Sequence, residues 1–166
     1  CIHVPGRRRS LCRNQLTLDL SREDVRQYII QCLDDILSNV KISYVKWDMN
    51  RHMSNLGSAM LPPERQRELP HRYMLGLYEI MEEITQKHPD VLFESCSGGG
   101  GRFDAGMLYY MPQIWTSDDT DPIERLYIQY GTSLVYPVSA MGAHVSAIPN
   151  HQSGRKTPLA TRGCVA

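Results

Sequence analysis

Residues 42–51 read Ile-Ser-Tyr-Val-Lys-Trp-Asp-Met-Asn-Arg. The first part of this stretch is short, β-branched and aromatic, which predicts a buried strand over residues 42–47 rather than a helix. The strand is followed at once by charged and amide side chains. Lys46 and Arg51 flank Asp48 in the sequence, and opposite charges within a few ångströms favour the ionised form of a carboxyl group. Asp48 is therefore a candidate nucleophile at the end of a strand.

Helices are expected on both sides of this strand. Apolar residues at helical spacing predict one helix over residues 21–39, with Ser21 as its N-cap, and a second helix over residues 64–88. A third helix is expected to begin after Asp121, where an N-cap residue is followed by a proline and then by a capping-box glutamate.

Further strands are expected between and after these helices. Short apolar runs predict strands over residues 91–95 and 113–117, and residues 134–145 form a fourth apolar segment. Residues 14–20 alternate polar and apolar side chains, the period of a half-buried extended segment. The remaining segments are expected to be irregular, namely residues 102–112 and the chain from residue 146 onward.

Strands that alternate with helices predict an α/β fold with parallel strands and right-handed crossovers. In such folds the polar functional groups gather at the carboxyl ends of the strands, both in closed barrels and in open doubly wound sheets. Four polar clusters follow this rule, and we expect them to share one mouth. They are residues 46–51, residues 96–102, residues 117–121 and His144.

The composition is that of an ordinary globular protein with one core. Of 166 residues, 42% are hydrophobic and 22% are charged. The formal net charge is +0, so nothing steers the chain toward nucleic acid or an anionic membrane. No apolar run approaches the roughly 20 residues of a membrane helix, and no signal peptide opens the chain. Neither a nucleic acid nor a membrane is an expected partner, and residues 7–9, a run of three arginines, are interpreted as a solvated loop.

The cysteines and the first residues bear on the protein's setting. Five cysteines are scattered without the paired spacing of a zinc site or a redox pair. Reduced thiols in a cytoplasmic protein are the expectation. The chain begins without an initiator Met and is interpreted as a fragment of a larger protein.

Two carboxyl groups at the ends of different strands suggest a reaction. Cleavage of a glycosidic bond needs one ionised carboxylate, which attacks or stabilises the sugar cation, and one protonated carboxyl, which protonates the leaving oxygen. Asp118 lies beside Asp119 and near Asp121, and like charges raise a carboxyl pKa. Asp48 is therefore the better nucleophile and Asp118 the better acid.

Other interpretations of these residues stay open from the sequence. A strand-end aspartate is often only a loop cap or an ion-pair partner, and Asp121 is interpreted as a helix cap. Residues 98–101 are four glycines without a phosphate-binding pattern, so they are expected to let the backbone approach a ligand closely or turn sharply. Cys96 is an alternative nucleophile with His144 as base. Trp47, Trp115 and Phe93 are expected in the core, and a metal site from His52, His144, Asp118 and Asp121 lacks clear ligand spacing, so no metal and no cofactor are expected.

Three long motifs carry a resemblance to a known family. Residues 44–51, 94–104 and 115–121 together resemble the bacterial α-galactosidases of glycoside hydrolase family 36, and the resemblance extends from His3 to Gly163. It implies that Asp48 is the nucleophile and Asp118 the acid/base of a retaining mechanism, in agreement with the charge argument. It also implies galactose contacts from Arg13, Lys46, Asn50, Cys96 and Gly99. Residues 7–12 depart from the family pattern, so the loop that carries Arg13 is expected to differ in shape.

The resemblance also implies a fold and an activity. Residues 1–166 are expected to form part of a catalytic (β/α)8 TIM barrel, approximately strands four to seven with their helices. An amino-terminal β-sandwich domain, the first barrel strands with an aspartate pair for the galactose hydroxyls, the last strand and a carboxyl-terminal β domain would be absent. The full-length protein is expected to be a tetramer.

The expected activity is that of a retaining α-galactosidase. It would hydrolyse terminal α-linked galactose from oligosaccharides of the melibiose and raffinose type by double displacement, with the two carboxyl groups about 5 to 5.5 Å apart. Two alternatives stay open. One is an inactive or sugar-binding barrel fragment, and the other is a galactosyl transferase of the raffinose-synthesising type.

Overall fold

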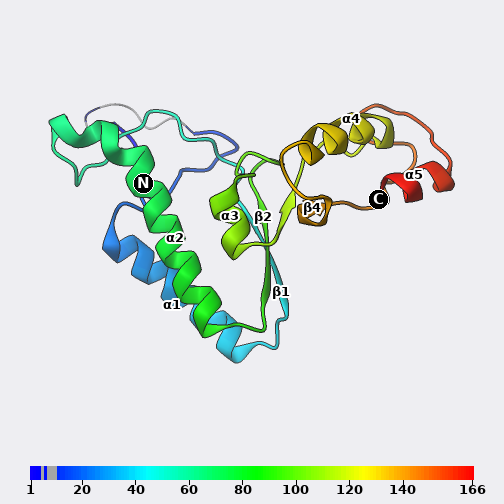
Figure 1. Ribbon diagram of the computed structural model, residues 1–166. Coiled ribbons are helices and arrows are strands. Elements are labelled where there is room, and N and C mark those ends of the chain that lie inside the picture. Colours follow the sequence, from blue (N-terminus) through cyan, green and yellow to red (C-terminus); the bar gives the residue numbers. More distant parts are fainter. Residues whose placement is uncertain (5, 7–10) are drawn as a thin grey trace. The chain divides into compact units, whose positions relative to one another are not determined.

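The computed structural model describes residues 1–4, 6 and 11–166 of the chain (Figure 1). It divides into two compact units. The first unit contains Cys1–Val45 and Met49–Leu92, and the second contains Lys46–Asp48 and Phe93–Ala166. The arginine run at residues 7–9, interpreted from the sequence as a solvated loop, lies outside the described residues.

The first unit is built on two helices that lie side by side (Figure 1). Helix α1 spans Glu23–Asn39, and helix α2 spans Leu69–Lys87 after the 3-10 helix η1 at Pro63–Glu68. The apolar residues at which helical spacing was predicted are all buried in α2, together with Leu69 and Gly76; they are Tyr73, Leu77, Ile80, Met81 and Ile84. The second predicted helix is confirmed, with its first turn tightened into 3-10 geometry.

One expectation for the first unit, the N-cap at Ser21, is wrong. Helix α1 begins at Glu23 with Arg22 in the N-cap position and no side-chain cap. The Ser21 hydroxyl donates instead to Oδ1 of the buried Asp19, at 2.6 Å. The Asp19 carboxylate therefore binds the Ser21 side chain in place of the helix end. Residues 14–20, expected to be a half-buried extended segment, follow a bridge between Cys12 and Gln15 without joining a strand, and the Ile2 N–H donates to the Thr17 carbonyl at 2.9 Å.

The second unit carries a four-stranded sheet whose spatial order, β1-β2-β3-β4, follows the chain. The strands are β1 (Tyr44–Asp48, which begins in the first unit), β2 (Leu92–Cys96), β3 (Gln113–Trp115) and β4 (Met141–Gly142). Strand β3 pairs in parallel with both β2 and β4, with Glu94 opposite Gln113 and Trp115 opposite Gly142. The predicted α/β class is confirmed. The fourth apolar segment contributes only the short β4, which follows the 3-10 helix η2 at Val138–Ala140.

Three helices accompany this sheet, and two of them were not expected. Helix α3 (Ala105–Tyr110) lies in the segment predicted to be irregular, because six residues are too few to display a helical period. Helix α5 (Leu159–Val165) lies in the segment predicted to be a loop. Asp104 caps α3 by accepting the Met107 N–H at 2.9 Å, and Met107 is fully buried.

The predicted helix after Asp121 is confirmed as α4 (Pro122–Ser133). The Asp121 carboxylate accepts the N–H groups of Ile123 at 2.8 Å and Glu124 at 3.3 Å. In a capping box the glutamate side chain accepts the N–H of the N-cap residue. Here the Asp121 N–H donates to Asp119 Oδ1 at 3.0 Å instead.

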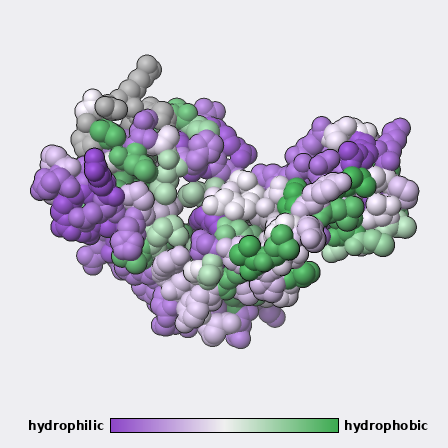
Figure 2. Space-filling view, turned by 45° about the horizontal axis from the view of Figure 1, so that its top comes forward, coloured by the Kyte–Doolittle hydropathy of each residue, from purple (hydrophilic) through white to green (hydrophobic). Residues whose placement is uncertain are grey.

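Aromatic and apolar side chains are only partly internal. Phe93 is buried, as predicted, whereas Trp47 and Trp115 are half-buried. Apolar side chains form patches on the surface (Figure 2), and the exposed ones on α4 and in the segment after it include Leu126, Leu134, Val135 and Val138. None of the described helices is long and apolar enough to cross a membrane. All five cysteines fall in the described part and are free thiols.

Candidate active site

Five of the seven predicted site residues belong to the second unit. Lys46 and Asp48 are in β1, Cys96 is the last residue of β2, Gly99 follows it, and Asp118 follows β3. Because neighbouring parallel strands end at the same edge of a sheet, these residues share the carboxyl edge of the strands.

Lys46 connects two strands of the sheet. Its Nζ lies 3.2 Å from Glu94 Oε1 on β2 and 4.2 Å from the centre of the Trp115 ring on β3. Only 8% of the Glu94 side chain is exposed, and burial raises its pKa. A buried carboxylate needs a nearby cation, and the Lys46 ammonium supplies that charge. Glu94 was not among the predicted site residues, since its only signal was a lone acid inside an apolar strand.

Cys96 is a hydrogen-bonding partner of Asp48 rather than a nucleophile. Burial is the main reason why the pKa of its thiol is raised; the Gly99 N–H opposes the shift, and the hydrogen bond to the Asp48 carboxylate adds to it. A catalytic cysteine needs a lowered pKa, so the alternative with Cys96 as nucleophile is disfavoured. The ring of His144, its proposed base, stacks on Trp115 with centroids 4.9 Å apart.

The glycine run packs against the backbone at the end of β3. Gly99 has φ of +83°, and a Cβ at this position would lie 2.8 Å from the Asp118 nitrogen and 2.9 Å from Ser117 Cα. At Gly100 a Cβ would lie 2.5 Å from the Thr116 carbonyl oxygen. The glycine run thus approaches the chain's own backbone at Asp118, whereas the expected close approach to a ligand stays a prediction.

Asp118 is exposed, and one of its carboxylate oxygens is held by an indole. The Trp115 Nε1–H donates to Asp118 Oδ1 at 3.2 Å. Its acidic neighbour Asp121, by contrast, is 1% exposed and ion-paired to Arg155 at 2.8 Å. Burial raises the pKa of Asp121, but the hydrogen bonds from Ser153 and the α4 backbone, together with Arg155, outweigh it and lower the pKa. The predicted repulsion of Asp118 by Asp121 is therefore largely compensated.

Arg125 and His144 complete the surroundings of Trp115. The Arg125 guanidinium carbon lies 4.4 Å from the centre of the ring, and Nη2 donates to the Ser117 carbonyl at 2.8 Å. Burial lowers the pKa of Arg125, while Asp119 and Asp118 oppose the shift. Burial, followed by the charges of Arg125 and Lys46, lowers the pKa of His144. Arg125 was missed because one arginine in an amphipathic helix carries no motif.

Arg102 ties the ends of β1 and β2 together. It is 8% exposed, and its Nη2 donates to the carbonyl of Cys96 at 2.7 Å and to that of Trp47 at 3.3 Å. Cys96 is itself a predicted site residue, and Trp47 directly precedes Asp48. Arg102 therefore fixes the strand ends that carry Asp48 and Cys96, a role that its place after the glycine run did not reveal.

The other two predicted sugar contacts, Arg13 and Asn50, belong to the first unit. Arg13 is exposed and has φ of +52°, and the bridge between Cys12 and Gln15 closes the turn that contains it. Asn50 is half-buried. Within residues 1–4, 6 and 11–166, no group of three or more His, Cys, Asp or Glu side chains is arranged to hold a metal ion.

The parallel sheet with its helices defines the chain as an α/β protein. Carboxylates at the ends of two of its strands are the residue type that a glycoside hydrolase site requires. The family model described as Melibiase matches residues 1–166. The chain belongs to the melibiase family.

Named relatives agree with this membership. The chain is 70% identical to alpha-galactosidase AgaA of Geobacillus stearothermophilus, covering 100% of this chain and 23% of the relative. It is 60% identical to alpha-galactosidase 1 of Pediococcus pentosaceus, covering 99% of this chain and 22% of the relative. The crystal structure of an AgaA variant in complex with raffinose superposes with a TM-score of 0.97 at 69% identity, covering 100% of this chain and 23% of that one. The chain thus spans about a quarter of the length of these relatives.

Proposed function

We propose that this chain is the central part of the catalytic barrel of a retaining α-galactosidase, with Asp48 as nucleophile and Asp118 as acid/base. The observation that carries the proposal is a set of contacts linking the two carboxylates. The Cys96 thiol donates to Asp48, the Trp115 indole donates to Asp118, and Lys46 lies over the Trp115 ring. Each carboxylate thus has its own donor, and one cation lies between the strands that carry them.

The order of the strands supports a barrel. An open doubly wound sheet reverses its strand order at a switch point, whereas a barrel adds each strand beside the previous one. The observed order β1-β2-β3-β4 follows the chain and so suits a barrel, and the resemblance of the motifs to the family places these strands at positions four to seven of a (β/α)8 barrel. The exposed apolar side chains on and after α4 (Figure 2) suit a segment that packs against further parts of such a domain. The sandwich, remaining strands and carboxyl-terminal domain would belong to the rest of the protein.

The proposed reaction follows from the two carboxyl groups. Asp48 attacks the anomeric carbon while Asp118 gives its proton to the leaving oxygen, which forms a covalent galactosyl-enzyme. Asp118, now ionised, accepts a proton from water, and the water oxygen displaces Asp48 with a second inversion. The thiol of Cys96 holds Asp48 in line for attack. The Trp115 indole holds Asp118 toward the same edge of the sheet.

The proposed substrates are oligosaccharides with a terminal α-linked galactose. The AgaA variant bound to raffinose supports this substrate class, and Lys46, Cys96 and Gly99, with Arg13 and Asn50, are the proposed galactose contacts. For this chain we also propose a cytoplasmic setting, in accord with its free thiols, and a tetrameric full-length protein.

The test uses the intact protein that contains this chain. An aryl α-galactoside and raffinose should both be hydrolysed, and NMR during turnover should detect α-galactose as the first-formed anomer. Asp48→Asn should abolish both activities, while Asp90→Asn, an isosteric change at an exposed turn residue, should leave them unchanged. Inversion of configuration, or full activity in Asp48→Asn, would contradict the proposal. Galactose transfer to an acceptor sugar in place of hydrolysis would favour the transferase alternative.

A further inference from the structure

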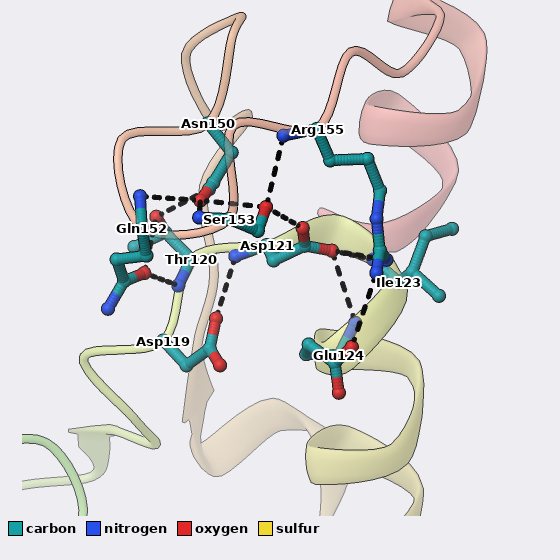
Figure 3. A network of polar contacts seen from close by, with 9 residues as sticks. All are labelled: Asp119, Thr120, Asp121, Ile123, Glu124, Asn150, Gln152, Ser153 and Arg155. Carbon is teal, nitrogen blue, oxygen red and sulfur yellow. Dashed lines mark hydrogen bonds and ion pairs between the residues drawn. The ribbon is translucent and has the colours of Figure 1, made fainter.

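A loop far along the chain is bonded to the segment that carries Asp118. Residues 150–155, here called the clamp loop, contact residues 118–121 through several side chains, and Figure 3 shows the contacts to Thr120 and Asp121. We infer that the clamp loop, through Gln152, is a positioning element that sets the direction of the Asp118 carboxyl group. The inference rests on the proposed role of Asp118 as acid/base.

Gln152 pairs with the backbone on both sides of Asp119. Its Nε2 donates to the Asp118 carbonyl at 3.0 Å, and its Oε1 accepts the Thr120 N–H at 2.8 Å. A single side-chain amide therefore satisfies one acceptor and one donor of the same short segment, as a neighbouring strand would. This pairing restrains the backbone torsions between the two residues, and with them the direction in which the Asp118 side chain leaves the backbone.

The clamp loop is itself held in shape by Asn150. This residue is 3% exposed, and its Oδ1 accepts the N–H groups of Gln152 at 2.9 Å and Ser153 at 3.0 Å. Its Nδ2 donates to the Thr120 hydroxyl at 3.1 Å. Its backbone N–H donates to the Arg155 carbonyl at 2.9 Å, which closes the loop at its far end.

The loop is anchored to α4 through Asp121. The Ser153 hydroxyl and Arg155 Nη1 both donate to the buried Asp121 carboxylate, the latter at 2.8 Å (Figure 3). Because Asp121 also caps α4, the end of the clamp loop is fixed to a rigid element. A side chain held by such a loop can impose a position on its partner.

Asp118 is consequently held from two directions. Gly99 contacts its backbone nitrogen so closely that a Cβ would lie 2.8 Å away, and Gln152 bonds to its carbonyl oxygen. The Asp118 carboxyl group can still rotate about the bonds of its side chain, and the Trp115 indole donates to one of its oxygens. The glycine run contributes the contact at the nitrogen, and the clamp loop supplies the one at the carbonyl.

The experiment compares substrates that differ in their need for an acid. In the intact protein, kcat/KM is measured for raffinose, whose leaving oxygen must be protonated, and for 2,4-dinitrophenyl α-galactoside, whose leaving group departs without a proton. Gln152→Ala should lower kcat/KM for raffinose by roughly 10- to 100-fold, the size expected when an acid catalyst is misplaced. The loss for the dinitrophenyl substrate should stay below about threefold, because attack by Asp48 does not depend on Asp118.

Two further variants sharpen the comparison. Gln152→Glu keeps the acceptor for Thr120 but turns a second oxygen toward the Asp118 carbonyl, so it should produce the same dependence on the leaving group. His151→Ala changes an exposed neighbour in the same loop and should leave both rates unchanged. Gln152 is exposed, so its variants should fold, and the melting midpoint is measured to verify this.

The outcomes separate the inference from the proposed function. A loss confined to raffinose supports the inference, since a general loss of folding would lower both rates together. Equal losses on the two substrates, or no loss on raffinose, would overturn it. A wild-type protein that cleaves neither substrate would overturn the proposed function, and the inference with it.

Discussion

Gly99→Ala should weaken both the fold and the catalysis of the intact protein. The added Cβ would lie 2.8 Å from the Asp118 nitrogen and 2.9 Å from Ser117 Cα, and both neighbours are backbone atoms that a rotamer change cannot move. The φ of +83° costs a residue with a Cβ roughly 1–2 kcal/mol. Overpacking adds about 1–3 kcal/mol, so the expected destabilisation is about 2–5 kcal/mol.

The assay is the melting midpoint of the catalytic domain in the intact protein, measured beside the turnover of raffinose. At about 2–4 °C per kcal/mol for a domain of 150–250 residues, the midpoint should fall by at least about 4 °C. Turnover should fall as well, because Asp118 is displaced. The matched control is Gly131→Ala in α4, where a Cβ would meet nothing within 4 Å; it should be neutral or stabilise by about 0.5–1 kcal/mol. A Gly99→Ala protein that melts and turns over like the wild type would refute the argument that backbone contact demands glycine here.

Three other changes test the charges of the two units. Lys46→Met should lower the melting midpoint, because the buried Glu94 carboxylate loses the ammonium at 3.2 Å. Adding Glu94→Gln to the same protein should recover part of this loss. An unchanged midpoint in Lys46→Met would contradict the expectation. Asp118→Ala should lose raffinose hydrolysis but keep attack on a dinitrophenyl substrate, and added azide, which displaces Asp48 without a base, should release a galactosyl azide that chromatography detects. The hydrogen bond from His88 is the main reason why the pKa of Asp34 lies below its ordinary value of 3.8, so the contribution of this pair to stability is complete above pH 3.8 and is lost as the pH falls through the lowered pKa. Asp34→Asn should therefore melt below the wild type at pH 6, and the difference should shrink as the pH is lowered below 3.8.

Periodic and capped elements were predictable from the sequence. The apolar face of α2 and the cap of α4 at Asp121 follow from local spacing and local hydrogen bonds, which a sequence displays directly. Helix α3 has six residues, with one buried side chain and one capping aspartate, and so little pattern cannot be distinguished from a loop. The Ser21 cap failed for a different reason, since the competing acceptor, Asp19, is buried by tertiary structure.

The residues of the candidate site were predictable in part. Asp48 and Asp118 were selected because each follows a strand, and the motifs added Lys46, Cys96 and Gly99. Arg125, Arg102 and Gln152 act through backbone carbonyls and an aromatic ring, some of them far away in the sequence, such as the Asp118 carbonyl 34 residues before Gln152. Contacts of this kind have no local signature, because the partner is a backbone group that every residue possesses.

Lys46 and Arg51, the two cations beside Asp48 in the sequence, each have further partners in the structure. From the sequence, Lys46 and Arg51 were both assigned to holding this carboxylate ionised. Arg51 belongs to the first unit, where its guanidinium bonds to the Gln15 carbonyl at 3.3 Å and the Ser54 hydroxyl at 3.0 Å, and Lys46 is engaged with Glu94 and the Trp115 ring.

The Cys96 thiol, a neutral donor whose pKa is raised chiefly by burial, also donates a hydrogen bond to the Asp48 carboxylate. A neutral donor stabilises the carboxylate without neutralising it, which preserves its charge for attack on a sugar cation. Lys46, two residues earlier, then balances the buried Glu94. Within the second unit, therefore, Asp48 has a hydrogen-bond donor from the adjacent strand β2, and that donor is Cys96.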